Sequence, residues 1–144
     1  MNKKLIRLLQ QAHAIEIGAY HAYEGHWRSS KNTKESNQIQ SIQIDELVHR
    51  HKVRFMLEQL NAQRNPILDA LFWVIGKTIS ASCYVIGYKA AMWGAGLMER
   101  LGSVCYYRIA REVKGLTNMR MYVTLLDMAI QEEEHEEFFK GCLK

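Results

Sequence analysis

The sequence contains one short motif twice, as Glu46-x-x-His49 and as Glu132-x-x-His135. A spacing of three residues places the carboxylate and the imidazole of each motif on the same face of a helix. Both motifs lie in stretches of helical periodicity, and two other such stretches carry a single glutamate on the corresponding face. These two glutamates are Glu16 and Glu99. Four carboxylates and two imidazoles suit iron or manganese ions, so the residues predict a site for two metal ions.

Four long helical segments are predicted to position these residues, over 2–28, 35–63, 67–114 and 117–140. The third segment is either continuous or broken. Ser30 or Thr33 is expected to cap the second helix, and the Asn65–Pro66 pair to end it. Gly115 is expected to end the third helix and Thr117 to cap the fourth.

Each segment has one apolar face whose residues recur at spacings of three and four, as in helices that pack against one another. In the third segment the expected inward positions are Val85, Tyr88, Met92, Ala95, Glu99, Gly102, Tyr106, Ile109 and Val113. The predicted fold is therefore all-α, a single domain over residues 1–144. One glutamate from each of two helices, with Glu-x-x-His from the other two, is the arrangement of a ferritin-like four-helix bundle with a dinuclear metal site.

Burial of the four glutamates needs compensation, because an ionised carboxylate buried alone costs several kcal/mol. The structural alternative is pairing with lysine or arginine, but these residues lie mostly on other faces of the segments. Metal ions are therefore the favoured partners. The remaining glutamates of "QEEEHEE" lie off the inward face and are expected in solvent. They are Glu133, Glu134, Glu136 and Glu137.

Other residues with chemical potential receive structural interpretations. Three histidines lie off the inward faces and are predicted at the surface: His13, His21 and His51. His26 lies on the inward face but far from Glu16, which favours a structural or neighbouring role over metal ligation. Tyr106 follows Glu99 by two turns, so it is either a hydrogen-bonding or redox neighbour of the metals or a packed core tyrosine. Cys105 is expected to behave as a small buried hydrophobe.

Charge and cysteine content exclude several classes of function. The net charge is +4, and no stripe of Arg and Lys interleaved with aromatic residues is present, so no nucleic-acid partner is expected. Three cysteines without a Cys-x-x-Cys motif indicate a reducing compartment rather than a disulfide scaffold or a zinc ribbon. No targeting segment is recognised, and we expect a cytoplasmic location, either free or peripheral on the inner face of the cell membrane.

Four stretches, in order and at near-identical spacing, resemble the demethoxyubiquinone hydroxylases of ubiquinone biosynthesis. "EIGAYHAYEGH" is similar to the first-helix motif of that family, and "DELVHRH" is similar to its second. "GYKAAMWGAGLMERLGSVCYY" resembles the run that leads to the third-helix glutamate and a later tyrosine, and "QEEEHEE" resembles the closing motif. His26 stands where the family has glutamine, Arg100 where it has a second glutamate, and Cys105 where it usually has histidine.

The resemblance implies the same six metal ligands that the helical faces select. They are Glu16, Glu46, His49, Glu99, Glu132 and His135. It also implies that Tyr106 is a catalytic neighbour of the site and that the cofactor is two iron ions, with manganese as the alternative. The partners implied are a hydrophobic quinone-like substrate and O2. No flavin or nicotinamide motif is present, so electrons are expected from reduced substrate, from NADH acting directly or from a partner protein.

Residues 67–98 are rich in aromatic and small side chains, but their longest uncharged run is eleven residues, from Thr78 to Tyr88. That length is too short to span a bilayer. The segment is expected to contact a membrane surface, to line an apolar channel, or to form core or a homodimer face.

The leading functional hypothesis is an O2-dependent di-iron monooxygenase that hydroxylates a quinone or quinol ring. A second hypothesis is an iron-binding ferroxidase related to ferritins and rubrerythrins, although the paired Cys-x-x-Cys motifs of rubrerythrin are absent. The third is a non-enzymatic partner of quinone-biosynthesis enzymes, suggested because the family has a further apolar helix beyond the position of Lys144.

Overall fold

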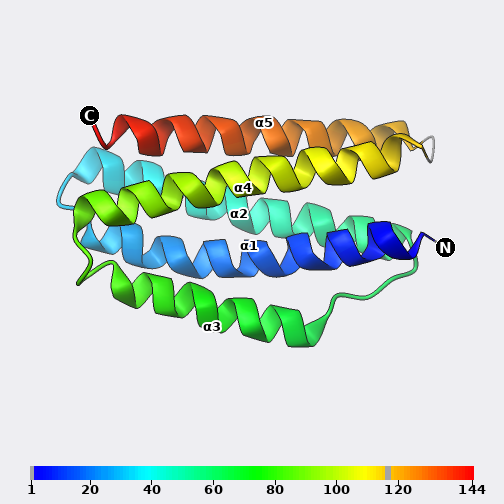
Figure 1. Cartoon of the computed structure of the whole chain (residues 1–144), viewed down its shortest axis with the longest axis horizontal. Helices are drawn as coiled ribbons and strands as arrows, with labels where there is room; N and C mark the ends of the chain where they lie inside the picture. Colours follow the sequence, from blue (N-terminus) through cyan, green and yellow to red (C-terminus); the bar gives the residue numbers. More distant parts are fainter. Residues whose placement is uncertain (1, 116–117) are drawn as a thin grey trace.

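The fold is a bundle of antiparallel helices with one additional helix on its outside (Figure 1). A computed structural model describes residues 2–115 and 118–144, and all regular structure in these residues is helical. The helices are α1 (Lys3–Ser29), α2 (Thr33–Gln59), α3 (Pro66–Ser82), α4 (Tyr88–Lys114) and α5 (Met119–Gly141). α1 packs along α2 and α4 packs along α5, while α3 packs on α1. The predicted all-α bundle is confirmed, with α1, α2, α4 and α5 as its four helices.

The third segment, 67–114, which the sequence left open as continuous or broken, is broken into two helices. The chain turns between Cys83 and Gly87, and Gly87 has a φ of 85°, a left-handed conformation that glycine adopts without steric cost. The helix that carries Glu99 therefore begins only at Tyr88. The predicted inward positions of Val85 and Tyr88 are wrong, because their exposed fractions are 83% and 38%.

The start of α2 also differs from the prediction. Its N-cap is Asn32, whose side chain accepts hydrogen bonds from the backbone N–H groups of Lys34 and Glu35. Ser30 instead ends α1, and Thr33 is the first helical residue of α2. An asparagine accepts from the first turn of a helix as well as serine does, so local propensity did not separate the candidates.

The ends of α2 and α4 were predicted with different success. α2 ends at Gln59, four residues before the predicted boundary at 63, and Asn61 adopts a left-handed φ of 52°. Gly115 ends α4 as predicted. Thr117, predicted to cap the last helix, lies outside the described residues, and Asn118 supplies the observed cap of α5.

Two apolar clusters occupy the two ends of the bundle, and the predicted metal ligands lie between them. The cluster toward the N-terminus of α1 includes Leu5, Leu9, Val53, Met56, Ile109, Val113, Leu125 and Met128. The cluster at the other end includes Tyr23, Ile39, Ile42, Met92, Ala95 and Phe139. Burial of these side chains is the main favourable contribution to folding, at roughly 1.5–3 kcal/mol for each large aliphatic residue. The two clusters therefore fix the position of the polar layer along the bundle axis.

The exposed side of α3 is apolar. Its most exposed large side chains, Ile67, Leu71, Trp73 and Val74, have exposed fractions of 78%, 51%, 48% and 52%. In the part of the chain that the structure describes, no helix combines the length and apolar character needed to cross a bilayer. Contact of this face with a membrane surface or with a second copy of the chain stays a prediction.

α3 approaches α1 closely because small residues line the contact. A Cβ atom added at Gly76 would overlap the carbonyl oxygen of Gly18, and one added at Gly25 would overlap the backbone of Ser80. A buried hydrogen bond lies at one end of the same contact. His13 Nδ1 is 2.9 Å from Asp69 Oδ1, and Arg64 donates to Asp69 Oδ2 at 2.8 Å.

The hydrogen bond between His13 and Asp69 corrects one sequence-based expectation. His13 was predicted at the surface but is only 3% exposed, because α3 covers the face of α1 that carries it. His51 is exposed as predicted, and His21 is half-buried with its ring against Trp73.

The α1–α3 contact gives a first prediction. Gly76→Ala should lower the free energy of unfolding by about 1–3 kcal/mol, because backbone atoms of α1 would have to move to admit the methyl group. Gly94→Ala is the matched control in α4, since nothing lies within 4 Å of its added Cβ. It should raise stability by about 0.5–1 kcal/mol through helix propensity alone. Urea unfolding followed by circular dichroism measures both; equal effects of the two substitutions would contradict the close contact.

Candidate metal centre

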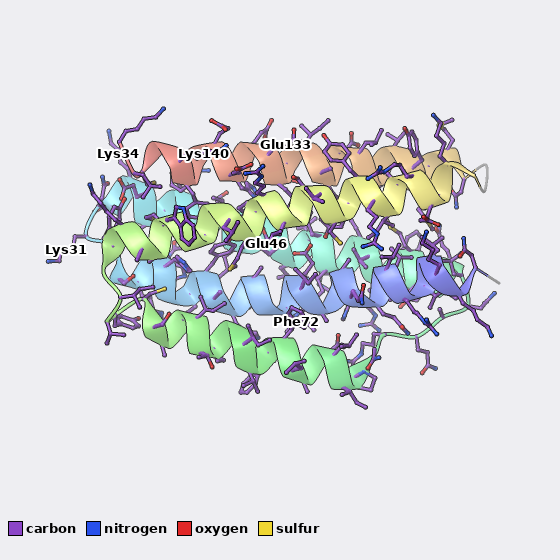
Figure 2. The ribbon with its side chains drawn as sticks, viewed as in Figure 1. Lys31, Lys34, Glu46, Phe72, Glu133 and Lys140 are labelled. Carbon is purple, nitrogen blue, oxygen red and sulfur yellow. The ribbon has the colours of Figure 1, made fainter. Side chains whose placement is uncertain are left out.

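All six predicted ligands meet inside the bundle, half-way between the two apolar clusters. Glu16 comes from α1, Glu46 and His49 from α2, Glu99 from α4, and Glu132 and His135 from α5. Each is at least 94% buried. Figure 2 shows Glu46 inside the bundle, whereas Lys31, Lys34, Glu133 and Lys140 point outward. The heptad-like spacing of each helix therefore brings residues far apart in sequence to one layer.

The side chains form two overlapping groups whose candidate ligand atoms lie within 4.8 Å of one another. One group is Glu16, Glu46, His49 and Glu132, and the other is Glu46, Glu99, Glu132 and His135. Glu46 and Glu132 belong to both groups, whereas Glu16 and Glu99 each belong to one. Each group thus offers three carboxylates and one imidazole, a set of side chains that could hold a metal ion.

Five buried polar atoms of these residues have no hydrogen-bond partner among the described residues. They are Glu46 Oε1, His49 Nδ1, Glu99 Oε2, Glu132 Oε1 and His135 Nδ1. They face one another across α2, α4 and α5: His49 Nδ1 lies 2.9 Å from Glu132 Oε1, and His135 Nδ1 lies 3.4 Å from Glu99 Oε2. Buried polar atoms without partners are rare and costly. Their types and their convergence fit metal ions, which would satisfy all five together.

No lysine or arginine among the described residues forms an ion pair with the four buried glutamates. Burial, followed by the charges of the neighbouring glutamates, raises the pKa of Glu46 and of Glu132 well above the ordinary value of 4.5. Without cations, protonation is the remaining way to reduce the repulsion. The alternative of Lys or Arg compensation is therefore not supported, and the cluster could hold metal ions.

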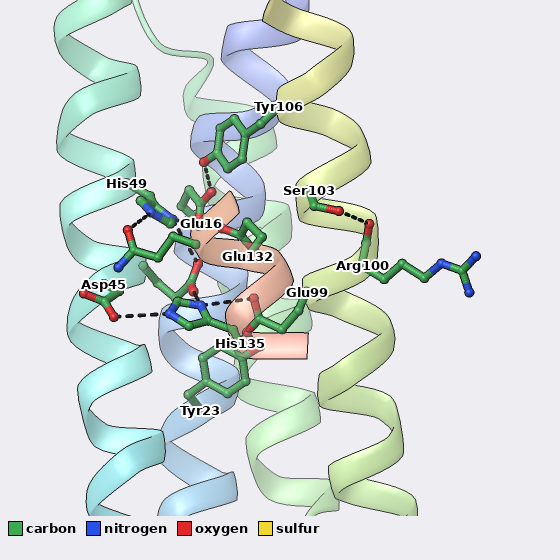
Figure 3. Close-up of polar contacts among 12 residues, drawn as sticks. Glu16, Tyr23, Asp45, His49, Glu99, Arg100, Ser103, Tyr106, Glu132 and His135 are labelled. Atoms are coloured by element: carbon green, nitrogen blue, oxygen red, sulfur yellow. Dashed lines mark hydrogen bonds and ion pairs between the residues drawn. The ribbon is translucent and has the colours of Figure 1, made fainter. Parts of the chain in front are cut away.

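The outer nitrogen of each histidine has a hydrogen-bond acceptor. His49 Nε2 is 3.0 Å from the side-chain oxygen of Gln131, and His135 Nε2 is 3.2 Å from Asp45 Oδ2 (Figure 3). Donation by Nε2–H leaves the lone pair of Nδ1 directed at the centre of the cluster, as metal ligation requires. Sequence reasoning missed both acceptors. The signal was that each stands directly before the glutamate of a Glu-x-x-His motif.

Glu16 and Glu99, which each belong to only one of the two groups, are oriented by two buried tyrosines. Tyr106 donates to Glu16 Oε1, and Tyr23 donates to Glu99 Oε1 (Figure 3). Each bond occupies one carboxylate oxygen, and in Glu99 it leaves the other, Oε2, facing the cluster. Of the two interpretations left open for Tyr106, its hydrogen bond supports the neighbouring role over mere packing. Tyr23 was missed, although it follows Glu16 by the interval that separates Tyr106 from Glu99.

Burial keeps these hydroxyl groups protonated. It raises the pKa of Tyr23 and of Tyr106 well above 10.0, and the nearby glutamates raise it further. Gly102 provides the space for the side chain of Glu132, because a Cβ added at Gly102 would come within 3.0 Å of Glu132 Cδ.

The remaining polar residues singled out from the sequence lie outside the two groups. His26 is buried, with its ring nitrogens 2.9 Å from the Ala22 carbonyl and 3.2 Å from the Ala91 carbonyl, so its role is structural. Cys105 is half-buried and packs at the edge of an apolar cluster, which agrees in part with the expected buried hydrophobe. Of the four outer glutamates of the last motif, Glu133, Glu134 and Glu137 are exposed and Glu136 is half-buried.

An apolar cavity of about 250 Å³ leads to the cluster between α1, α3 and α4. Its apolar walls include Phe72, Ile75 and Ile79 from α3, and Met98 and Leu101 from α4. Its polar lining consists of the hydroxyl-bearing Tyr23 and the four glutamates of the cluster. The part of 67–98 that faces α1 thus lines an apolar cavity, and whether this cavity serves as a channel stays a prediction.

These features define the class of protein: an antiparallel helical bundle with a buried carboxylate–imidazole cluster that could hold metal ions. A family model described as ubiquinone biosynthesis protein COQ7 matches residues 3–101. The chain belongs to this family, and membership implies a role in ubiquinone biosynthesis. The match includes Glu16, Glu46, His49 and Glu99, whereas the last helix lies beyond it. Comparison with curated proteins finds no match, and neither does comparison with solved structures.

The electrostatics of the cluster give a second prediction. At neutral pH and without metal, Glu132→Gln should be more stable than wild type by roughly 1–3 kcal/mol, because it removes one of the buried like charges. A carboxyl with a raised folded-state pKa stabilises the fold below its ordinary pKa of 4.5 and loses that contribution as pH rises through the folded-state value. The difference between the two proteins should therefore disappear as pH falls toward 4.5.

Metal should reverse the order. With Mn(II) or Fe(II) present at neutral pH, wild type should gain more stability than Glu132→Gln, because the variant has lost an anionic ligand. Thermal unfolding at several pH values, with chelator and with metal, measures both effects. A metal-free Glu132→Gln protein less stable than wild type at neutral pH would contradict the uncompensated cluster.

Proposed function

We propose that this chain is an O2-dependent di-iron monooxygenase that hydroxylates the ring of a quinone or quinol. The observation that carries the proposal is the apolar cavity that ends on the carboxylate cluster. Oxidation of free Fe(II), the ferroxidase alternative, needs a polar entry for a hydrated cation and has no use for an apolar one. A cavity walled by Phe72, Ile75 and Ile79 instead suits a flat hydrophobic ring. Family membership supports the same substrate class.

The six clustered side chains would hold the two iron ions. One ion would be held by Glu16, Glu46, His49 and Glu132, and the other by Glu46, Glu99, Glu132 and His135, following the two groups. The iron ions would supply activation of O2, which protein side chains cannot perform unaided. Manganese suits the same ligand types and stays the alternative.

The chain itself would position the substrate and exclude water. The walls from α3 and α4 would hold the ring beside the carboxylates, and their apolar side chains would keep bulk solvent from the reactive centre. Tyr23 lies where the cavity meets the cluster, and its proton stays on the hydroxyl that donates to Glu99. Hydroxylation with O2 places one oxygen atom in the ring and releases the other as water, so two electrons and two protons are consumed. Reduced quinol, NADH or a partner protein remain the predicted electron donors.

Oxygen-isotope incorporation tests the proposed activity. Iron-loaded wild type, given a short-tailed quinol, NADH and ¹⁸O2, should form a ring-hydroxylated product that carries one ¹⁸O atom. Glu99→Gln should lower the rate by at least about 100-fold, because it removes a charged ligand, while the helical circular dichroism stays unchanged. Glu133→Gln, an exposed acid on α5, is the control and should retain wild-type activity. Wild-type turnover by Glu99→Gln would overturn the assignment.

The role of the cavity gives a separate prediction. Ile79→Trp would fill the cavity from α3, so kcat/KM for the quinol should fall about tenfold or more, with bound metal unchanged. Val74→Trp is the matched control, because Val74 lies on the same helix, is 52% exposed and does not line the cavity. Steady-state kinetics and metal analysis of both variants measure the effect. Equal kcat/KM values for the two variants would exclude this cavity as the substrate path.

A further inference from the structure

The side chains of the candidate metal centre are arranged with approximate two-fold symmetry. One pair of equivalent hydrogen-bonding residues, Asp45 and Gln131, differs in charge. α1 with α2, and α4 with α5, each contribute a glutamate followed seven residues later by a tyrosine, and a Glu-x-x-His motif. The contacts cross between the halves, since Tyr23 of α1 donates to Glu99 of α4 and Tyr106 of α4 donates to Glu16 of α1. Each half therefore supplies the other with equivalent hydrogen bonds.

The residue before each motif follows the same crossed scheme. Asp45, before the motif on α2, accepts from His135 on α5, and Gln131, before the motif on α5, accepts from His49 on α2. The two distances are similar, 3.2 Å and 3.0 Å. The chemical groups differ, because Asp45 presents a carboxylate and Gln131 presents a neutral amide.

We propose that this difference makes the two metal positions unequal, so that the position of His135 binds its ion more tightly and fills before the position of His49. The inference rests on the proposed dinuclear centre and assigns Asp45 and Gln131 as positioning residues within it. A carboxylate that accepts from the outer N–H of an imidazole increases the basicity of the inner nitrogen, and a neutral amide does so less. The changes that such outer partners produce in metal affinity are typically 10–100-fold.

The ligands of the two groups are matched in burial and in formal charge. Both imidazoles are buried, at 0% and 6% exposure, and both groups share Glu46 and Glu132. Each group adds one further glutamate, and a buried tyrosine holds each of these. The formal ligand charge is thus the same on the two sides, and the acceptor bonded to the imidazole differs in charge. The positive charge of Lys52, which acts on His49, would favour a cation at the His49 position less and so works in the same direction.

Mn(II) titration of the metal-free protein tests the inference, with free Mn(II) measured by electron paramagnetic resonance. Wild type should bind two ions in separate steps whose dissociation constants differ about 10–100-fold. Asp45→Asn should weaken the tighter step about tenfold, and Gln131→Glu should tighten the weaker step about tenfold, so each single variant brings the two steps together. Opposite effects from two substitutions of nearly equal size are not expected from a purely structural role.

Matched variants assign the order and control for charge. Glu99 belongs only to the His135 group and Glu16 only to the His49 group, so Glu99→Gln should remove the tight step and Glu16→Gln the weak step. Asp127→Asn removes one exposed negative charge from α5 and should leave both steps unchanged. The double variant Asp45→Asn/Gln131→Glu should restore two separated steps, with Glu16→Gln now removing the tight one.

The outcomes separate this inference from the proposed function. No Mn(II) or Fe(II) bound to wild type would overturn the metal centre itself. A different outcome is that two ions bind and both dissociation constants are unchanged between wild type, Asp45→Asn and Gln131→Glu. This result would leave the metal centre in place and overturn the assigned roles of Asp45 and Gln131.

Discussion

The burial of four glutamates in one layer of a small helical bundle is the constraint on which the rest of the structure depends. Each buried carboxylate costs several kcal/mol unless a cation or hydrogen bonds compensate it. Among the described residues no lysine or arginine does so, and five polar atoms of the cluster have no partner. The bundle tolerates this layer because large apolar clusters on both sides stabilise the helices independently of it. The layer therefore contributes little to the stability of the fold by itself, and its side chains could hold metal ions.

Several residues around the cluster serve this arrangement without being ligands. Tyr23 and Tyr106 occupy the outer oxygens of two glutamates, and Asp45 and Gln131 accept from the outer nitrogens of the two histidines. These bonds orient the side chains around the centre, so little reorganisation would be needed for an ion to bind there. The atoms that point away from the centre have hydrogen-bond partners, and the atoms that point toward it have none among the described residues.

α3 forms one wall of the cavity beside the carboxylate cluster. It contributes no ligand, yet its close contact with α1 through Gly18, Gly25 and Gly76 places its apolar side chains beside the carboxylates. The other side of the same helix is exposed and apolar. One helix thus lies between an apolar cavity and an apolar external surface.

Much of this could be predicted from the sequence because local periodicity determines it. The apolar faces, the Glu-x-x-His spacings and the two lone glutamates depend on residues within a few helical turns. They therefore identified the all-α fold, most of the inward positions and the six clustered side chains. Asn32 as the N-cap of α2 escaped prediction because several neighbouring residues have similar capping propensity.

The tertiary structure alone decided what depends on contacts between distant segments. Packing between helices decides the break before Tyr88, the position of α3 on α1 and the burial of His13. Local propensity carries no information about such packing. The crossed bonds of Tyr23, Asp45 and Gln131 join residues 76 to 90 positions apart, so no spacing along the chain could show them. Local periodicity thus identified most of the residues that face the core, whereas the contacts among them depend on how the helices pack against one another.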